Sequence, residues 1–358
     1  MKPLPWLELI RLQQLLQWAV LVGAGGLTSF LLHNAGLPAA PLLGPMLVAI
    51  CMGAAGARIQ VPRILFRSGQ GLVGLMVAKS VTLGVLMALS KDWYLMLLVT
   101  ALTILLSAGV GLGLACFSRI PADASAWGTA PGAASAMIAM AEEGGSDGRL
   151  VACMQYVRVV CVVMLGAWVS QLLVASSIHL PGHINPESPF TWLGLGSTLA
   201  LAILGAFSGN LIPAGALLTS VIFGSAFQLA GWLDITLSET LMALAYGAIG
   251  SYIGLRFNRA TIIYVAKLLP VIAFANLVLI LLCAILAWPL SHLFGKDFLS
   301  MFLATSPGGL DAMAIMAVET GSDASFVVAL QTLRLLAVVV SGAFCSQLII
   351  SWASRLSR

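Results

Sequence analysis

The sequence predicts an all-α polytopic membrane protein, on two observations of composition and one of internal order. Hydrophobic residues make up 60% of the 358 residues and charged residues only 8%, whereas a soluble domain carries about 25% charged residues. Many apolar runs are long enough to cross a bilayer as helices. One stretch also occurs twice, half a chain length apart. We therefore expect about ten transmembrane helices in two inverted five-helix repeats, each with a re-entrant or broken helix.

The repeated stretch runs from Thr129 to Arg158 and again from Thr305 to Arg334, at one constant offset without a gap. Between Thr129 and Cys161, 14 of 33 positions are identical to their partners. An apolar composition does not explain the identities Pro131/Pro307, Gly132/Gly308, Glu143/Glu319, Ser146/Ser322, Asp147/Asp323, Gln155/Gln331 and Arg158/Arg334. The pattern predicts a duplicated domain, with a first membrane repeat over 1–175, a linker over 176–190 and a second membrane repeat over 191–358.

Both halves are expected to follow one plan. The expected helices of the first half are about Leu15 to Leu32, a Pro-rich start of the second span at Leu37 to Leu47, Gln70 to Leu89, Trp93 to Phe117 and Arg149 to Ala175. Those of the second half are about Thr191 to Gly209, Leu211 to Leu229, Glu239 to Leu255, Leu268 to Leu293 and Ser322 to Trp352. The segment between the halves, Ser176 to Pro189, is polar and turn-rich.

The segments 121–145 and 297–321 decide the topology, because each either crosses the membrane or dips in and returns. Residues 121–135 are poor helix material, so we expect an extended start followed by a short helix from Ala133 to Ala141. If both segments return, twelve basic loop residues lie inside and two outside; if both cross, the division is nine to five. The positive-inside rule therefore favours re-entry, with both termini cytoplasmic.

The two breaks have the chemistry of a ligand site. A proline suits the first turn of a helix, glycines allow close approach, and a half-helix N-terminus at membrane depth offers free amide donors and a partial positive charge. Paired breaks of this kind form substrate sites in secondary transporters. The alternative for each break alone is a tightly packed kink. The break residues that we single out are Thr129, Pro131, Gly132, Thr305, Ser306, Pro307, Gly308 and Gly309.

Each break is followed by a Gln and an Arg that share one helix face, Gln155 with Arg158 and Gln331 with Arg334. An arginine at this depth costs about 2.5–3.5 kcal/mol on insertion scales and is usually functional or paired. Two interpretations stay open. Each arginine contacts an anionic solute, or it forms a structural ion pair, with Glu143 or Glu319 as partner.

Asp311 belongs to the second copy alone, since Ser135 stands at the equivalent position. It could carry a coupling proton, bind a cation, or interact with the dipole of its own helix. Lys79 is another intramembrane charge and a candidate counter-ion for Asp311. With the break residues and the two Gln–Arg pairs, Asp311 completes the set that we predict to bind substrate.

Other site classes find no support in the sequence. The six cysteines lie in apolar runs without CxxC spacing, so they are read as packing residues. His179 and His183 are separated by Pro181-Gly182, which argues against a metal site. No nucleophile–base pair is evident, so we expect no catalytic residue, metal or cofactor. The scattered basic residues indicate no nucleic-acid partner. One G-x-x-x-G, Gly205 to Gly209, is a weak indication of a homodimer.

These motifs resemble the AbrB family (AbrB-duplication) of bacterial inner-membrane proteins. The resemblance rests on A-P-G-A-A-S-A-M-I-A-M-A followed by R-L-V-A-C-M-Q-Y-V-R, and on L-A-T-S-P-G-G-L-D followed by A-L-Q-T-L-R. It departs at Ala130-Pro131-Gly132-Ala133, where the family more often has S-P-G-G. The resemblance implies an inner (plasma) membrane location and a duplicated fold. Members carry the labels "regulator" and "ammonia monooxygenase"; the second fits poorly, since no ligand cluster for copper or iron is present.

The leading hypothesis is a secondary transporter that moves a small polar or anionic solute by alternating access. Its partners would be the lipid bilayer and a small-molecule or ion ligand. The first alternative is a membrane-embedded regulator of gene expression. A regulator that acts on DNA should carry a soluble basic domain, which the sequence lacks, so transport is favoured. A membrane monooxygenase is the weaker alternative, and we expect the protein not to be an enzyme.

Overall fold

The computed structural model describes residues 5–37, 39–81, 83, 87, 92–132, 134–143, 145–176, 192–208, 215–232, 235–257, 259, 263 and 266–338. Within these residues the regular structure is helical throughout, and no strand occurs. The expected linker from Ser177 onward, Gly209 of the G-x-x-x-G, and the end of the last expected helix beyond Val338 lie outside the described residues. The helical architecture agrees with the predicted class.

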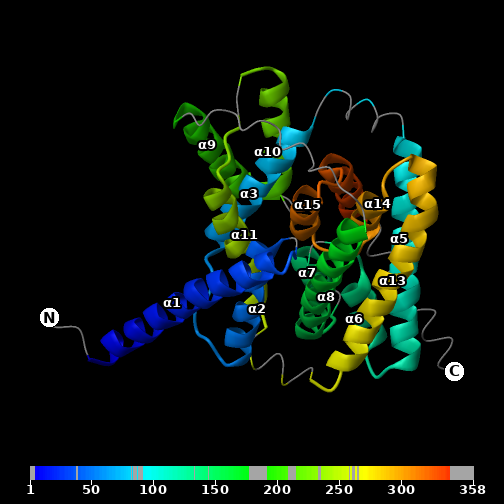
Figure 1. The fold of residues 1–358 in the computed structure, drawn as a ribbon. Coiled ribbons are helices and arrows are strands. Elements are labelled where there is room, and N and C mark those ends of the chain that lie inside the picture. Colours follow the sequence, from blue (N-terminus) through cyan, green and yellow to red (C-terminus); the bar gives the residue numbers. More distant parts are fainter. Residues whose placement is uncertain are drawn as a thin grey trace.

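The helices form two bundles, which stand side by side in Figure 1. The first, here the glycine-packed bundle, consists of α1 (Pro5–Asn34), α2 (Ala40–Ala54), α3 (Arg63–Ser80), α9 (Trp192–Ser208), α10 (Gly215–Leu229) and α11 (Glu239–Gly254). The second, here the hairpin bundle, consists of α5 (Trp93–Phe117), α6 (Ala122–Thr129), α7 (Ala134–Glu143), α8 (Gly148–Ser176), α13 (Leu269–Phe294), α14 (Phe298–Thr305) and α15 (Leu310–Glu319), joined by the helix Ala324–Val338. Each bundle therefore draws helices from both halves of the chain.

Glycines set the helix spacing in the glycine-packed bundle. A side chain at Gly74 of α3 would collide with the backbone carbonyl of Leu217 on α10, and one at Gly250 of α11 would collide with that of Leu42 on α2. Small residues let apolar helices approach closely enough for backbone packing. The second and third helices of one half thus pack against the third and second helices of the other.

Substitution of Gly71 tests this packing. A Cβ at Gly71 would lie 2.7 Å from the carbonyl oxygen of Ala202 on α9. We expect Gly71→Ala to lower the free energy of unfolding by about 1–3 kcal/mol, because α3 and α9 must separate. Gly23→Ala on α1 is the control, since no atom lies within 4 Å of the place that its new methyl group would occupy. Thermal unfolding of the purified protein should show a loss for the first variant only; equal melting temperatures would contradict the packing argument.

Four helical segments of the described chain are long and apolar enough to cross a bilayer: Gln13–Asn34, Trp93–Phe117, Gly148–Leu172 and Leu269–Phe294. Shorter apolar helices accompany them at Ala40–Ala54, Gly194–Ser208, Gly215–Leu229 and Ala324–Val338. Large apolar side chains point outward, such as Phe117, which is 94% exposed. Such an exterior suits hydrocarbon and not water. The protein is therefore a helical membrane protein, and the total of ten spans stays a prediction.

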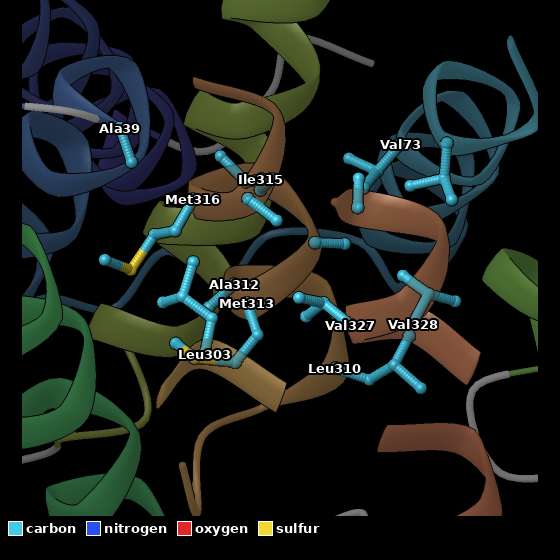
Figure 2. Packing of buried hydrophobic residues seen from close by; sticks show 14 of the residues in the cluster. Ala39, Val73, Leu303, Leu310, Ala312, Met313, Ile315, Met316, Val327 and Val328 are labelled. Carbon is cyan, nitrogen blue, oxygen red and sulfur yellow. The ribbon is translucent and has the colours of Figure 1, made fainter. Parts of the chain in front are cut away.

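The largest apolar cluster lies where the two bundles meet (Figure 2). It includes Val73 of α3, Met313 and Ile315 of α15, and Val327 and Val328 of the helix Ala324–Val338. All five side chains are buried. The bundles therefore share one continuous apolar contact, with α15 at its centre.

The prediction that the segment 121–135 starts as an extended chain was wrong, because α6 is helical from Ala122 to Thr129. Tertiary contacts override the weak helix propensity. Every residue from Ala124 to Thr129 is buried, and Ser125 Oγ donates a hydrogen bond to the Gly111 carbonyl of α5 at 2.8 Å. The expected short helix is present as α7. In the second copy, α14 and α15 begin and end at the positions equivalent to the bounds of α6 and α7.

Candidate functional site

Each copy of the repeated stretch folds back on itself as a hairpin. In the first, Ser146 Oγ, just after α7, donates a hydrogen bond to Asp123 Oδ2 in the first turn of α6 at 2.6 Å. In the second, the backbone N–H of Asp323 donates to Ser300 Oγ of α14 at 2.8 Å. The start and the end of each hairpin thus lie together, and the break between its two short helices forms the tip.

The two tips have nearly the same backbone shape. Ala130 (φ −57°, ψ 126°) ends α6, and Ser306 (φ −59°, ψ 139°) ends α14, each followed by a proline. The extended conformation at these residues stops the helix while its last carbonyls are still without helical partners. Both tips are buried or nearly so, so these carbonyls must find donors within the protein.

Gln155 and Arg158 of α8 supply the donors for the first tip. Gln155 Nε2 donates to the carbonyl oxygens of Trp127 (2.8 Å) and Ala130 (3.2 Å). Arg158 Nη1 donates to Ala130 at 2.7 Å, and Nη2 donates to Gly132 at 3.4 Å. Arg158 Nη2 also donates to Gln155 Oε1 at 2.6 Å. We call this Gln–Arg arrangement the brace of the tip.

The second tip has the same brace, built from the same atoms. Gln331 Nε2 donates to the carbonyl oxygens of Leu303 (2.8 Å) and Ser306 (3.1 Å). Arg334 Nη1 donates to those of Thr305 (3.2 Å) and Ser306 (2.8 Å), and its Nη2 donates to Gln331 Oε1. Every one of these bonds has its counterpart at the equivalent atoms of the first brace. The brace is thus part of how each tip is held.

The ion pair considered for the second arginine does not form. Among the described residues the ion pair is Lys296–Asp323, at 2.6 Å, and Arg334 bonds backbone carbonyls instead of Glu319. The Glu143 side chain lies outside the described residues. The sequence signal for the true partners of the arginine was the break in the preceding helix. A helix that stops inside the protein exposes carbonyls, and these attract a guanidinium as a carboxylate does.

The two arginines still have unused hydrogen-bonding capacity. Arg158 is 1% exposed and Arg334 is 4% exposed, and the Nε–H of each has no partner. The two guanidinium groups lie close enough to interact electrostatically, with the Cys283 thiol of α13 near both. The second tip also approaches the first brace, since a Cβ at Gly309 would lie 3.9 Å from Val159 Cγ2. The second tip and the first brace therefore lie close together.

The three predicted hydroxyls differ in availability. Thr129 Oγ1 donates to the Ser125 carbonyl and Thr305 Oγ1 to the Met301 carbonyl, both at 2.9 Å, so both protons are used within their own helices. Ser306 Oγ is buried and has no partner. Of the three, Ser306 is the hydroxyl that remains free to bind a ligand.

Asp311 lies in the first turn of α15, next to the second tip. Its Oδ2 accepts a hydrogen bond from Gln70 Nε2 of α3 at 2.8 Å, and its Oδ1 is buried without a partner. Lys79, considered as a counter-ion, lies nine residues beyond Gln70 on α3, roughly 13 Å along the helix axis. Sequence reasoning missed Gln70, whose one signal was a polar side chain in an apolar helix.

Known proteins are similar to this chain over most of its length. The family described as "Transition state regulatory protein AbrB" matches residues 41–350. A protein of Escherichia coli (strain K12), named "Putative regulator AbrB", is 36% identical over 344 residues, which cover 96% of this chain and 99% of that protein. The "Uncharacterized protein YhjN" of Bacillus subtilis (strain 168) is 27% identical over 351 residues, or 90% of each chain. No solved structure matches the chain.

Proposed function

Since the chain belongs to the AbrB family, we propose a function that its paired hairpins support: secondary transport of a small polar or anionic solute by alternating access. The solute would bind where the two tips and the two braces meet. The residues that we propose for this site are those predicted above, with Ser306 and the two arginine Nε–H groups as the donors still available. The protein would act in the bacterial inner membrane.

The observation that carries the proposal is that each half-helix tip holds a buried arginine and that Gly309 of the second tip approaches Val159, next to Arg158 of the first brace. Helices α7 and α15 each begin at a tip, where their first amide groups lack helical acceptors. A helix N-terminus and a guanidinium both attract negative charge. The bonds to carbonyls lower the cost of burying each arginine but leave its charge. An anion at this site would offset that charge, which favours an anionic solute.

The division into two bundles supports alternating access. The whole site belongs to the hairpin bundle, and the glycine-packed bundle lies against it along α3. In transporters built from inverted repeats, one bundle moves against the other and exposes a fixed site to each side in turn. We propose the same here, with ten spans, two re-entrant hairpins that enter from opposite sides, and both termini in the cytoplasm.

A membrane-embedded regulator is the second candidate, because the E. coli relative and the family description are both named for regulation. Such a protein would bind the same solute at the same tips but would not move it. The two candidates therefore agree on binding and differ on flux. Uptake of a bound solute into liposomes that contain the purified protein separates them, since a regulator alone gives binding without uptake.

A thermal-shift screen of the purified protein tests the binding site. Small anions, organic acids and amines serve as probes, and we expect anions to raise the melting temperature. Ser306→Ala should then weaken binding of the active probe by roughly 10-fold or more, because a hydrogen bond to a charged group contributes about 1.5–3 kcal/mol. The brace uses the Ser306 carbonyl and not its hydroxyl, so the fold should be retained.

Ser170→Ala is the matched control for this experiment. Ser170 Oγ is also buried without a partner, but it lies twelve residues beyond Arg158 on α8, roughly 18 Å along the axis. Its loss should leave ligand affinity unchanged. The proposal fails if no probe stabilises the protein, or if both serine variants respond as the wild type does.

A further inference from the structure

Asp311 is a polar group in an apolar contact between the two bundles. Among the labelled helices, α3 and α15 make the most extensive contact from one bundle to the other. The apolar cluster at this contact includes Val73, Leu310 and Met313 (Figure 2). Within this contact, Gln70 of α3 donates to Asp311 Oδ2 at 2.8 Å. Any relative motion of the two bundles would therefore change the surroundings of the Asp311 carboxyl group.

The other carboxyl oxygen, Oδ1, is buried and has no partner. The ion pair that the described residues form, Lys296–Asp323, does not include Asp311. A buried carboxylate without a cationic partner is unfavourable, and a bound proton removes its charge. The charged side chains of α15 and of the helices around it are Arg63, Arg67 and Lys79 of α3, Arg149 and Arg158 of α8, Arg334 of the helix Ala324–Val338, and Glu319 of α15 itself, while α14 has none.

The chemistry near Asp311 favours a proton over a metal ion such as sodium. A sodium site needs several oxygen ligands, and in transporters these are often carbonyls of an unwound helix. The carbonyls of Leu303, Thr305 and Ser306 at the second tip already accept hydrogen bonds from Gln331 and Arg334. A proton requires only one oxygen, and Oδ1 provides it.

We propose that Asp311 binds the coupling proton of the transporter and that the protonated carboxyl is the form docked against Gln70. Loss of the proton to water converts the carboxyl to a carboxylate, which favours an arrangement in which α15 separates from α3 and the carboxylate is hydrated. Proton binding and bundle position are thereby linked. The inference rests on the proposed function. It assigns one proton site to each chain, because Ser135 occupies the equivalent position of the first copy.

Infrared difference spectroscopy between acidic and alkaline buffer tests the proton site without any solute. The probe is the proton itself, and the sample is the full chain in lipid nanodiscs. We expect the protonated-carboxyl signal to contain a component from Asp311 that disappears as the pH rises and that is missing from the difference spectrum of Asp311→Asn. Asp123→Asn is the matched control, because Asp123 is a hairpin carboxyl bound to Ser146 and lies on α6, which packs against α5, α7 and α8 of its own bundle. A protonated-carboxyl signal that is unchanged in Asp311→Asn, or no protonated carboxyl at any pH, overturns the proposal.

A second variant covers the case in which Asp311→Asn does not fold. Gln70→Leu keeps the carboxyl but removes its donor, so the Asp311 band should shift in frequency; an unshifted band overturns the docking contact. These results are independent of solute flux. If the band behaves as expected and no solute is bound or moved, the proposed transport fails while the proton site stands. If solute is moved and the Asp311 band is missing, the proposed transport stands while the proton site fails.

Discussion

Arg334→Ala is expected to lower the free energy of unfolding by about 3–5 kcal/mol, the range for breaking a buried hydrogen-bonded charge network. The guanidinium donates to the carbonyls of Thr305 and Ser306 and to Gln331 Oε1. Its removal leaves buried acceptors without donors, and each such acceptor costs about 1–3 kcal/mol. Thermal unfolding of the purified variant measures the effect. Arg158→Ala should show a loss of the same size, because the first brace has the same bonds.

Two further variants distinguish the loss of the hydrogen bonds of Arg334 from the loss of its positive charge. Arg334→Lys keeps the positive charge, but one ammonium cannot reproduce the planar fork that reaches two carbonyls and an amide oxygen. It should therefore recover little of the lost stability. Arg149→Ala removes an exposed arginine from the first turn of α8 and should change stability by no more than about 0.5 kcal/mol. If Arg334→Lys is as stable as the wild type, the brace is not what holds the tip.

The braces show which part of the site can be predicted from a sequence. The spacing of Gln155 and Arg158 places both side chains on one helix face, and the same spacing recurs at Gln331 and Arg334. Their partners could not be predicted in the same way. Backbone carbonyls have no identity in a sequence, so a search for partners of an arginine considers carboxylates and overlooks a broken helix.

The contact between Gln70 and Asp311 shows a second limit. The two residues are 241 positions apart. Each lies in a helix whose apolar face could pack against many other helices, so the sequence does not indicate this pairing. The repeat offset also gives no guide, because Ser135 replaces the carboxyl in the first copy and Tyr246 is the equivalent of Gln70 in the second. Contacts between the two halves can be inferred where both copies of the repeated stretch agree. Where the copies differ, the packing of whole helices decides, and that depends on glycine contacts such as those of Gly74 and Gly250.

The same reasoning distinguishes glycines that the fold requires from those that a ligand would require. Gly309 adopts φ −73° and ψ 141°, an ordinary extended conformation that any residue can take. The nearest atom to a Cβ there would be Val159 Cγ2 at 3.9 Å, which is normal van der Waals contact. Neither backbone strain nor packing therefore explains a glycine at this position. Gly309 belongs to the second tip and faces α8 next to the first brace, so we propose that the approach of a solute is the reason for this glycine.

Gly309→Val is accordingly expected to change the melting temperature little and to weaken solute binding by at least about 10-fold, or about 1.4 kcal/mol. Its branched side chain suits extended backbone, so the fold tolerates it, while its methyl groups occupy space that the bound solute needs. Gly309→Ala should have an intermediate effect on binding, with the same stability. The measurement is the affinity of the best probe from the thermal-shift screen, at matched protein concentration. A valine variant that binds as tightly as the wild type would place the solute away from the second tip, whereas one that loses stability in step with binding would assign Gly309 to packing.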